Sequence, residues 1–311
     1  DEVFRSLGLY TVQEWQPWAG FWLTGALRYD VNHLSAEDAF LSDGDDSGER
    51  DYQQFSPSVG ASYAYLSSHH LYANYSFSFE TPTLSELSAN PAGAQGFNDQ
   101  LLPQLARNYE AGLKGKLDTG LEYRLSAFYI QLQQERLPYE LSSSPGRVFY
   151  RNAGRSRRQG VEAWLQWVPG ERWKGRLSYT FSDFQYEAYE VGGAVFDGNA
   201  LPGIPRHAGS AMVRYRYLPK GQIVAEGRYL SDLYADDANT AVAEGFVDLQ
   251  LRAVYQWPMG WGHLEVFGGI NNLLDARYVN NVRLNAFGGR YFEAAPGRNI
   301  FAGVRVQTGT E

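Results

Sequence analysis

Apolar and polar residues alternate over residues 245–257, GFVDLQLRAVYQW, and predict one long two-faced strand. One face carries the apolar side chains Val247, Leu249, Leu251, Ala253, Tyr255 and Trp257. The other face carries the polar side chains Asp248, Gln250, Arg252 and Gln256. Such a stretch exceeds the usual strand of about 5 or 6 residues and can cross a hydrocarbon layer at a tilt, which takes about 9–11. A charged face cannot point at lipid, so we expect a wall strand of a transmembrane β-barrel, with water on its inner side.

The same period of two recurs along the chain and predicts 13 strands in total. Besides residues 245–257, the predicted strands are residues 5–14, 21–31, 58–65, 71–79, 109–117, 121–134, 161–167, 173–181, 211–217, 223–229, 264–270 and 300–307. Short turns such as DTG and LPKG alternate with long polar loops. Outer-membrane barrels have short periplasmic turns and long outer loops, an arrangement that a soluble sandwich has no reason to adopt. The expected fold class is therefore all-β, an antiparallel transmembrane β-barrel.

The odd strand number has its own implication. With 13 antiparallel strands the first and last run in the same direction and cannot close a barrel by antiparallel pairing. Bacterial single-chain barrels have even strand numbers. We therefore expect the sequence to be the C-terminal part of a larger barrel.

Composition narrows the class of protein further. The formal net charge of -8 argues against nucleic acid as a partner, and the absence of Cys is compatible with an oxidising compartment. No apolar run is long enough for a transmembrane helix. The first residues, DEVFRSLG, lack the features of a signal peptide, so export would imply that processing or truncation has removed the start.

Several sequence elements resemble the TonB-dependent outer-membrane receptors, including siderophore receptors. The stretch over residues 271–306 contains NNLLDARYVNN and then PGR ahead of the last strand, and similar elements are RNYEAGL, QGVEA, FETPTLSEL, ALRYD and NALPGIPRH. The ending, VRVQTGTE, departs from the aromatic residue on which the family usually stops, which leaves an extension or a tag as alternatives for residues 308–311.

The resemblance implies a 22-strand barrel whose lumen holds an N-terminal plug. Residues 1–311 would then form a partial barrel domain with about the last 13 strands, and the plug and the early strands would lie outside this sequence. It also implies that the inner-membrane TonB-ExbB-ExbD complex supplies energy through that missing part. The expected location is the outer membrane of a Gram-negative bacterium.

Arginine and tyrosine residues in two of the long loops are the candidate ligand site. The candidates are Arg147, Tyr150, Arg151, Arg155, Arg157 and Arg158 around one loop, and Arg283, Arg290 and Tyr291 in the last. Guanidinium groups bind carboxylates bidentately and rings pack on planar groups, which favours an anionic chelate or an acidic cofactor as ligand. The alternative is that these arginines pair with carboxylates across the lumen wall or contact lipopolysaccharide phosphates.

Acidic loop residues offer a weaker candidate for calcium. Asp43, Asp45 and Ser47 have the spacing of oxygen ligands at the start of a calcium loop. Position twelve of that loop is Gln54 and not Glu, so a solvated acidic loop tip is the favoured alternative. Asp236 and Asp237 are expected to cap a loop, with a cation contact as the alternative.

The sequence shows no catalytic motif and no cluster of histidines, so we expect neither an enzyme nor a resident cofactor. The expected function is import of a scarce ligand, a ferric siderophore or a similar small cofactor, with TonB energy. The alternative from another class is a passive porin or an autotransporter-type translocator. The expected surroundings are lipid and lipopolysaccharide.

Overall fold

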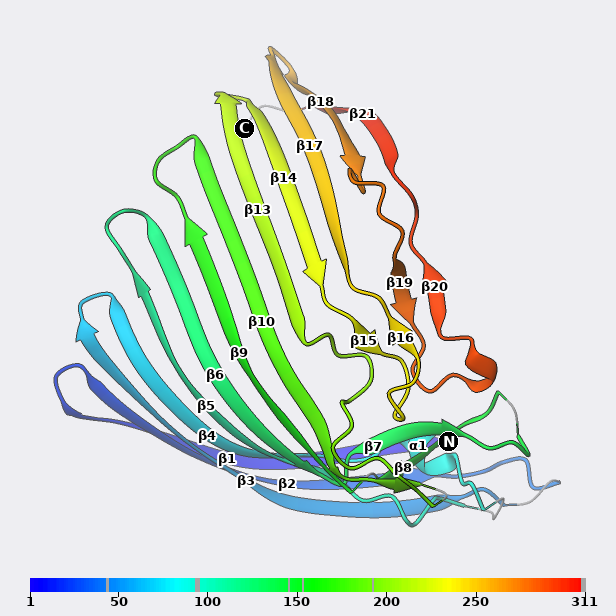
Figure 1. Cartoon of the computed structure of the whole chain (residues 1–311). Helices are drawn as coiled ribbons and strands as arrows, with labels where there is room; N and C mark the ends of the chain where they lie inside the picture. Colours follow the sequence, from blue (N-terminus) through cyan, green and yellow to red (C-terminus); the bar gives the residue numbers. More distant parts are fainter. Residues whose placement is uncertain (43–44, 93–95, 145, 153, 192, 309–311) are drawn as a thin grey trace.

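The computed structural model describes residues 1–42, 45–92, 96–144, 146–152, 154–191 and 193–308. Its main element is a 13-stranded antiparallel sheet in which the strands follow one another in chain order, as Figure 1 shows. The strands are β1 (Glu2–Trp18), β2 (Phe21–Ala36), β3 (Gly48–Leu66), β4 (His69–Glu80), β5 (Gln104–Lys116), β6 (Leu121–Gln133), β9 (Arg155–Trp167), β10 (Trp173–Ala188), β13 (His207–Leu218), β14 (Gly221–Leu230), β17 (Phe246–Met259), β18 (Gly262–Asn271) and β21 (Asn299–Thr308). The sheet confirms the predicted all-β class and the 13 predicted strands.

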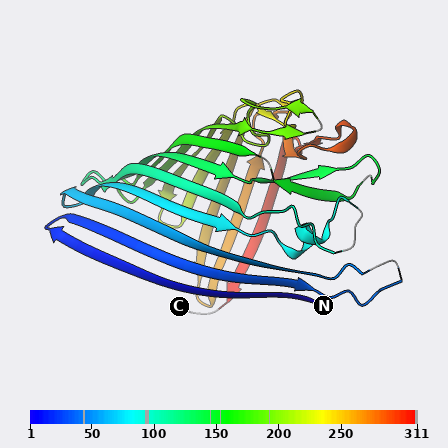
Figure 2. The same cartoon turned by 90° about the horizontal axis from the view of Figure 1, so that it is seen from below.

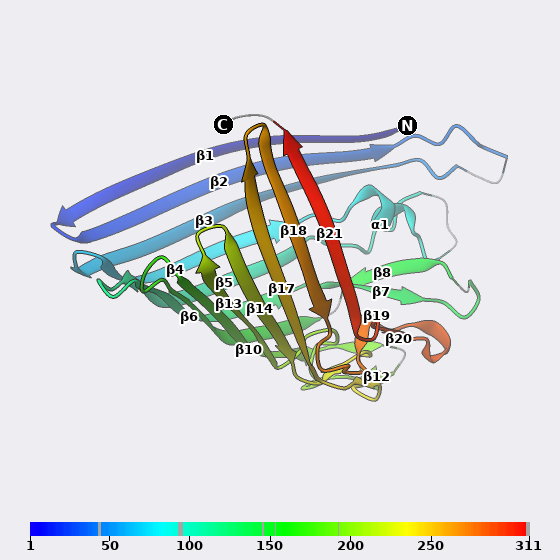
Figure 3. The same ribbon diagram turned by 90° about the horizontal axis from the view of Figure 1, so that it is seen from above.

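The sheet curls into a barrel wall that does not close (Figures 2 and 3). Within the residues that the structure describes, strand β1 pairs only with β2, and β21 pairs only with β18. Consecutive neighbours are antiparallel throughout, so the two edge strands run in the same direction, as expected from the odd strand number. No helix in the described residues has the length and apolar character needed to cross a membrane.

The register of the sheet separates an apolar outer face from a polar inner face. Leu177 of β10 is paired with Leu165 of β9 and with Ala211 of β13, and all three lie on the outer face. The neighbours of Leu177 along the strand, Arg176 and Ser178, point inward. Large apolar side chains on the outer face stay exposed, and Leu177 retains 46% of its accessible surface. Two different solvents on the two faces account for this pattern.

The outer apolar band has the height of a hydrocarbon layer. On β10 it extends from Trp173, whose ring packs at a tilt against that of Tyr215, to the first outward carboxylate, Asp183. Ten residues at about 3.3 Å each, tilted by about 40°, span about 25 Å across the membrane. Leu177 therefore lies near the middle of the band.

The two rims of the sheet differ as the sequence predicts. Short turns lie along one rim and the long loops along the other (Figure 1). The loops are more ordered than alternation alone suggests, because they contain four small two-stranded sheets. These pair β7 (Arg136–Glu140) with β8 (Val148–Asn152), β11 (Glu190–Val191) with β12 (Ala194–Val195), β15 (Leu233–Tyr234) with β16 (Val242–Ala243), and β19 (Val279–Val282) with β20 (Phe292–Ala294).

Several sheet strands also extend further toward the loops than predicted. Strand β3 begins at Gly48 rather than at position 58, because residues 48–57 pair in continuous register with the end of β2. Polar side chains on both faces hide this extension from a search for apolar alternation, since beyond the membrane neither face has to be apolar.

Buried apolar side chains gather beneath the loops and not inside the barrel wall. One cluster consists of Leu34, Leu87, Phe97 and Leu101, and Leu87 has no exposed surface. It holds the β4–β5 loop, with the short helix α1 (Leu84–Ser88), against β2. The second cluster consists of Tyr186, Tyr189 and Leu201. The wall itself encloses no apolar centre among the described residues, which agrees with a water-facing inner surface.

Helix α1 begins with a capping box. The Thr83 hydroxyl accepts a hydrogen bond from the amide of Glu86, and the Glu86 carboxylate accepts one from the amide of Thr83. The guanidinium of Arg136 in β7 pairs with Glu86 at 3.2 Å and with Glu80 at 2.7 Å. The cap therefore lies at the contact between two long loops.

We predict that Thr83→Ala loosens this helix by about 1 kcal/mol, because the amide of Glu86 loses its acceptor. Hydrogen–deuterium exchange of the peptide over residues 84–88 measures the change. The matched control is Thr81→Ala, which removes a hydroxyl with no hydrogen bond among the described residues. Equal exchange in the two variants would contradict the role of the cap.

Candidate functional site

A pocket of about 630 Å³ lies at the loop rim, between the β7–β8 hairpin and the last long loop. The side of the hairpin contributes Pro138, Tyr139, Gly146, Val148 and Tyr150. The last loop contributes Arg283, Leu284, Asn285, Ala286 and Arg290. We call these ten residues the mouth pocket. Its two walls come from segments more than a hundred residues apart in the sequence.

The mouth pocket is cationic and aromatic. The side chains of Arg283 and Arg290 make no ion pair or hydrogen bond with any described residue, and both arginines are exposed. The guanidinium of Arg151 packs over the ring of Tyr139, with Cζ 4.4 Å from the ring centroid. Two guanidinium groups with no partner among the described residues can bind an anionic group, and the two tyrosines, on opposite faces of the hairpin, add aromatic surface to the lining.

The structure brings three of the nine arginine and tyrosine candidates together in this pocket, namely Tyr150, Arg283 and Arg290. Two others lie beside it. The Arg147 guanidinium lies over the Phe149 ring at 5.1 Å, and the Tyr291 carbonyl accepts a hydrogen bond from the amide of Arg283 at 2.8 Å.

The other four candidates are not in the mouth pocket. Arg158 forms an ion pair with buried Glu135, and Arg151 donates to the Tyr189 hydroxyl at 3.0 Å. Arg155 and Arg157 share the outer face of β9 with Val161, as their register with β6 shows. The sheet therefore separates these two from the mouth pocket.

Asp237 in the β14–β17 loop joins the loops around the pocket. Its carboxylate accepts hydrogen bonds from the hydroxyls of Tyr186 at 2.8 Å and Tyr189 at 3.1 Å. Its carbonyl accepts from the Asn199 side chain at 2.8 Å, and its amide donates to the Asn285 side chain at 3.0 Å. These five residues, the Asp237 network, link three long loops, and Asn285 also lines the mouth pocket.

The two tyrosines of the Asp237 network are buried. The solvent-accessible fractions of Tyr186 and Tyr189 are 1% and 3%. Burial, together with the neighbouring Asp237 carboxylate, raises the pKa of Tyr189 to about 12. The hydroxyl therefore remains a hydrogen-bond donor at neutral pH, and a buried donor without an acceptor would be costly.

Asp236 caps the same loop. Its carboxylate accepts hydrogen bonds from the amides of Thr240 and Ala241 at 2.8 and 3.0 Å, and from the Thr240 hydroxyl. Burial alone would raise the pKa of Asp236, but these hydrogen bonds outweigh it and lower the pKa. The two neighbouring aspartates are thus both engaged with loop residues, as expected of a loop cap.

The calcium candidates lie in the β2–β3 loop. Asp43 is outside the described residues. The Asp45 carboxylate accepts the amide of Ser47 at 3.0 Å, and the Ser47 hydroxyl accepts the amide of Asp38 at 2.9 Å. The hydrogen bonds from Ser47 lower the pKa of Asp45. Within the described residues, no group of three or more His, Cys, Asp or Glu is placed to hold a metal ion.

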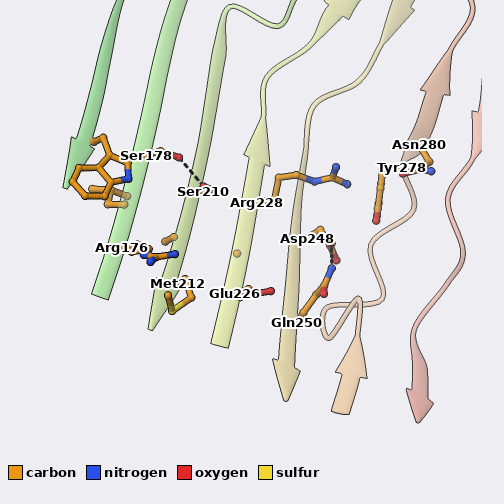
Figure 4. Close-up of a pocket in the computed structure, with 14 residues that line it drawn as sticks. Arg176, Ser178, Ser210, Met212, Glu226, Arg228, Asp248, Gln250, Tyr278 and Asn280 are labelled. Atoms are coloured by element: carbon orange, nitrogen blue, oxygen red, sulfur yellow. Dashed lines mark hydrogen bonds between the residues drawn. The ribbon is translucent and has the colours of Figure 1, made fainter. Parts of the chain in front are cut away.

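A second pocket, of about 560 Å³, lies on the inner wall (Figure 4). Its lining includes Arg176, Glu226, Arg228, Asp248 and Gln250, which come from strands of the sheet. One carboxylate oxygen of Asp248 accepts a hydrogen bond from the side-chain amide of Gln250 at 3.0 Å. The other oxygen is buried without a hydrogen-bond partner among the described residues. The wall therefore presents charged side chains to whatever fills the lumen, with a buried Asp248 oxygen behind them.

Comparison with known proteins decides the family. Residues 1–273 match the family model described as TonB dependent receptor-like, beta-barrel. The chain belongs to the TonB-dependent receptor family. This family consists of outer-membrane proteins of Gram-negative bacteria and is not a class of enzymes.

A curated relative within the TonB-dependent receptors is the probable siderophore receptor PiuA of Acinetobacter baumannii. It is 26% identical over 220 residues, which cover 68% of this chain and 28% of the relative. This chain thus spans well under half the length of this curated relative.

Solved structures of TonB-dependent receptors share the fold. The siderophore receptor PiuA of Acinetobacter baumannii is 20% identical, with a TM-score of 0.76 over 97% of this chain and 43% of PiuA. The copper transporter OprC is 20% identical, with a TM-score of 0.76 over 98% and 48% of the two chains. The ferric citrate transporter FecA is 19% identical, with a TM-score of 0.77 over 97% and 44%.

Two of the sequence elements that resemble TonB-dependent receptors touch each other in the fold. The Asn272 side chain donates to the carbonyls of Ala276 at 2.9 Å and Pro296 at 3.3 Å. The Asp275 carboxylate accepts from the amide of Arg298 at 3.0 Å. The NNLLDARY and PGR elements therefore close the base of the last long loop, the one that carries Arg283 and Arg290.

Tyr139 and Asn285 are pocket residues that the sequence did not single out. Tyr139 belongs to β7, whose pairing with β8 places it opposite Phe149. A search for a second strand around the RVFY stretch would have found the hairpin. Asn285 offers no such sequence signal, because it reaches the pocket through its contacts with the β14–β17 loop.

Proposed function

We propose that this chain forms barrel wall and outer loops of an outer-membrane receptor that captures an anionic metal chelate, with ferric siderophores as the leading class. In this proposal the TonB-ExbB-ExbD complex supplies the energy for import, acting through parts of the receptor other than these 311 residues. The surrounding phase is outer-membrane lipid. The protein binds and moves its ligand without a chemical reaction.

The mouth pocket is the observation that carries the proposal. Two arginines that lack an ion pair or hydrogen bond among the described residues lie with two tyrosines at the rim of long loops, where a ligand from outside would arrive first. Ferric chelates of the citrate or catecholate kind present carboxylate or phenolate oxygens and planar faces, which are the groups that guanidinium and phenol rings recognise. The structural neighbours include the siderophore receptor PiuA and the ferric citrate transporter FecA, which supports the same ligand class.

The inner wall supports transport through the lumen. Arg176, Arg228 and Glu226 line it together with the buried, half-used carboxylate of Asp248. A hydrated wall of mixed charge allows a polar ligand to pass through the lumen, whereas an apolar wall would exclude it.

We predict that Arg283→Ala and Arg290→Ala each weaken binding of an anionic ferric chelate about tenfold. Each loses a charge-assisted hydrogen bond, and a tenfold change corresponds to about 1.4 kcal/mol. The measurement is titration of the full-length gene product with ferric citrate and with a ferric catecholate, to find which binds, followed by titration of the variants with that chelate.

Arg155→Ala is the matched control, because it removes an exposed arginine from the same rim but from the outer face. It should bind the chelate as the wild type does. A full-length protein that bound no ferric chelate yet conducted ions through lipid bilayers would instead support the porin or translocator alternative.

A further inference from the structure

A row of basic and amide side chains crosses the outer face directly above the apolar band. Register aligns Arg107 of β5, Gln131 of β6, Arg157 of β9 and Gln185 of β10 as lateral neighbours. We call these four residues the outer row. In the next outward-facing row toward the band, the aligned residues are Tyr109, Tyr129, Gln159 and Asp183.

The outer row faces away from the lumen. Ser156, next to Arg157 in β9, is completely buried on the inner side, where its hydroxyl donates to Glu135. Side chains alternate along a strand, so Arg157 points to the opposite face, together with Gln159 and Val161. The mouth pocket and the outer row are consequently separate surfaces.

Positive charge exceeds negative charge around this row. Arg155 and Arg206 flank it, so four arginines stand against two carboxylates, Asp183 in the aligned rows and exposed Glu187 beside the Ala188–Arg155 pair. Arg107 and Arg206 rest on outward rings, with Cζ 5.8 Å from the Phe77 centroid and 5.6 Å from the Phe181 centroid. The side chains of Arg107 and Arg155 have no ion pair or hydrogen bond with described residues.

Arg157 is held in place by its neighbours. It donates to the Gln185 side chain at 3.0 Å and lies 3.6 Å from the Asp183 carboxylate, which also accepts from Gln159 at 2.8 Å. The Nε of Arg157 is buried and makes no hydrogen bond among the described residues, whereas the side chain as a whole is 32% exposed. A positioned, partly exposed guanidinium about 10 Å from Arg107, across two strand spacings, suits a headgroup with more than one anionic oxygen.

We propose that the outer row binds the phosphate groups of an outer-leaflet glycolipid. The apolar band starts immediately below, where the centroid of the Tyr109 ring lies 5.0 Å from that of Tyr75 and 6.2 Å from that of Tyr129. Tyrosine is the side chain expected where lipid tails meet headgroups. A molecule that reached the arginines would therefore place its tails on this band, which a soluble anion cannot do.

This inference rests on the proposed outer-membrane location but not on chelate binding. The test uses the full-length gene product in phosphatidylethanolamine vesicles that contain a phosphorylated glycolipid or its dephosphorylated form. Glycolipid that remains bound after detergent extraction is quantified by mass spectrometry. The variant is Arg107→Gln with Arg157→Gln, and the control is Arg283→Gln with Arg290→Gln in the mouth pocket.

The double outer-row variant should retain about thirtyfold less phosphorylated glycolipid than the wild type, since two arginines near an anionic surface are lost. The mouth-pocket variant should retain the wild-type amount, and the dephosphorylated glycolipid should be retained poorly by all three proteins. Equal retention by the wild type and the outer-row variant would overturn the proposal. So would equal retention of the two glycolipids, or binding of inorganic phosphate alone with the affinity of the lipid.

Chelate binding serves as the folding check for the outer-row variant. It should equal that of the wild type, because the outer row and the mouth pocket lie on opposite faces. If the wild type binds no ferric chelate, the proposed ligand class fails while the lipid result still stands, with heat-modifiable gel mobility then reporting the fold.

Discussion

Leu177→Arg should destabilise the protein in a lipid bilayer by about 2–4 kcal/mol, the cost of an arginine on the lipid face at the midplane of a barrel. Leu177 lies near the middle of the outer apolar band, between Leu165 and Ala211, and is exposed. A guanidinium at this depth has no water and no partner within the band. Urea titration of the full-length gene product in vesicles measures the free energy of unfolding.

The matched control changes the next residue. Ser178→Arg puts the same side chain on the inner face, where Ser178 bonds to Ser210 at 2.7 Å and Arg176 already occupies the preceding inward position. Its cost should be well below that of Leu177→Arg. If the two variants lose the same stability, the assignment of lipid and water to the two faces is wrong.

Asp237→Ala should loosen the outer loops by about 2–6 kcal/mol in local stability. The substitution leaves the buried hydroxyls of Tyr186 and Tyr189 without an acceptor, at about 1–3 kcal/mol each. Hydrogen–deuterium exchange should rise in residues 199–206 and 233–243. Chelate binding should weaken as well, because Asn285 connects this network to the mouth pocket.

A double-mutant cycle separates the lost acceptor from a general defect. Tyr186→Phe with Tyr189→Phe removes the two donors, and removing both sides of a buried hydrogen bond is far less costly than removing one. Adding these changes to Asp237→Ala should therefore restore part of the lost protection. No restoration would mean that the tyrosine hydroxyls are not what Asp237 stabilises.

Alternation along the chain was sufficient to find the sheet. Each membrane-crossing strand, such as β17 over Phe246–Met259, meets lipid on one side and water on the other, so its pattern is local and visible in the sequence. The extension of β3 back to Gly48 was not visible, since it lies beyond the apolar band and pairs through polar residues. The number of strands could therefore be predicted from the local sequence pattern. The length of a strand such as β3 could not, because it depends on pairing with the neighbouring strand.

The candidate site could be predicted only in part from the sequence, because the contacts that form it join distant segments of the chain. Arg155, Arg157 and Arg158 are close in sequence, but a period of two places the first two outside and the third inside. The same period, applied to these arginines in the sequence, is enough to assign them to different faces. The Asp237 network could not be foreseen, because Asp237 and Tyr186 are 51 residues apart and meet only after the loops have folded.

The hydrogen bonds that tie the outer loops together have a thermodynamic consequence for capture. Ordering a flexible side chain at an interface costs about 0.5–1.5 kcal/mol, and ordering loop backbone adds to that loss. Asn285 and the hairpin carrying Tyr150 are already held by the fold, so a ligand that enters the mouth pocket meets walls whose conformational entropy was lost during folding. Substitutions far from the ligand could then change its residence time solely by changing how much conformational entropy the loops lose when the ligand binds.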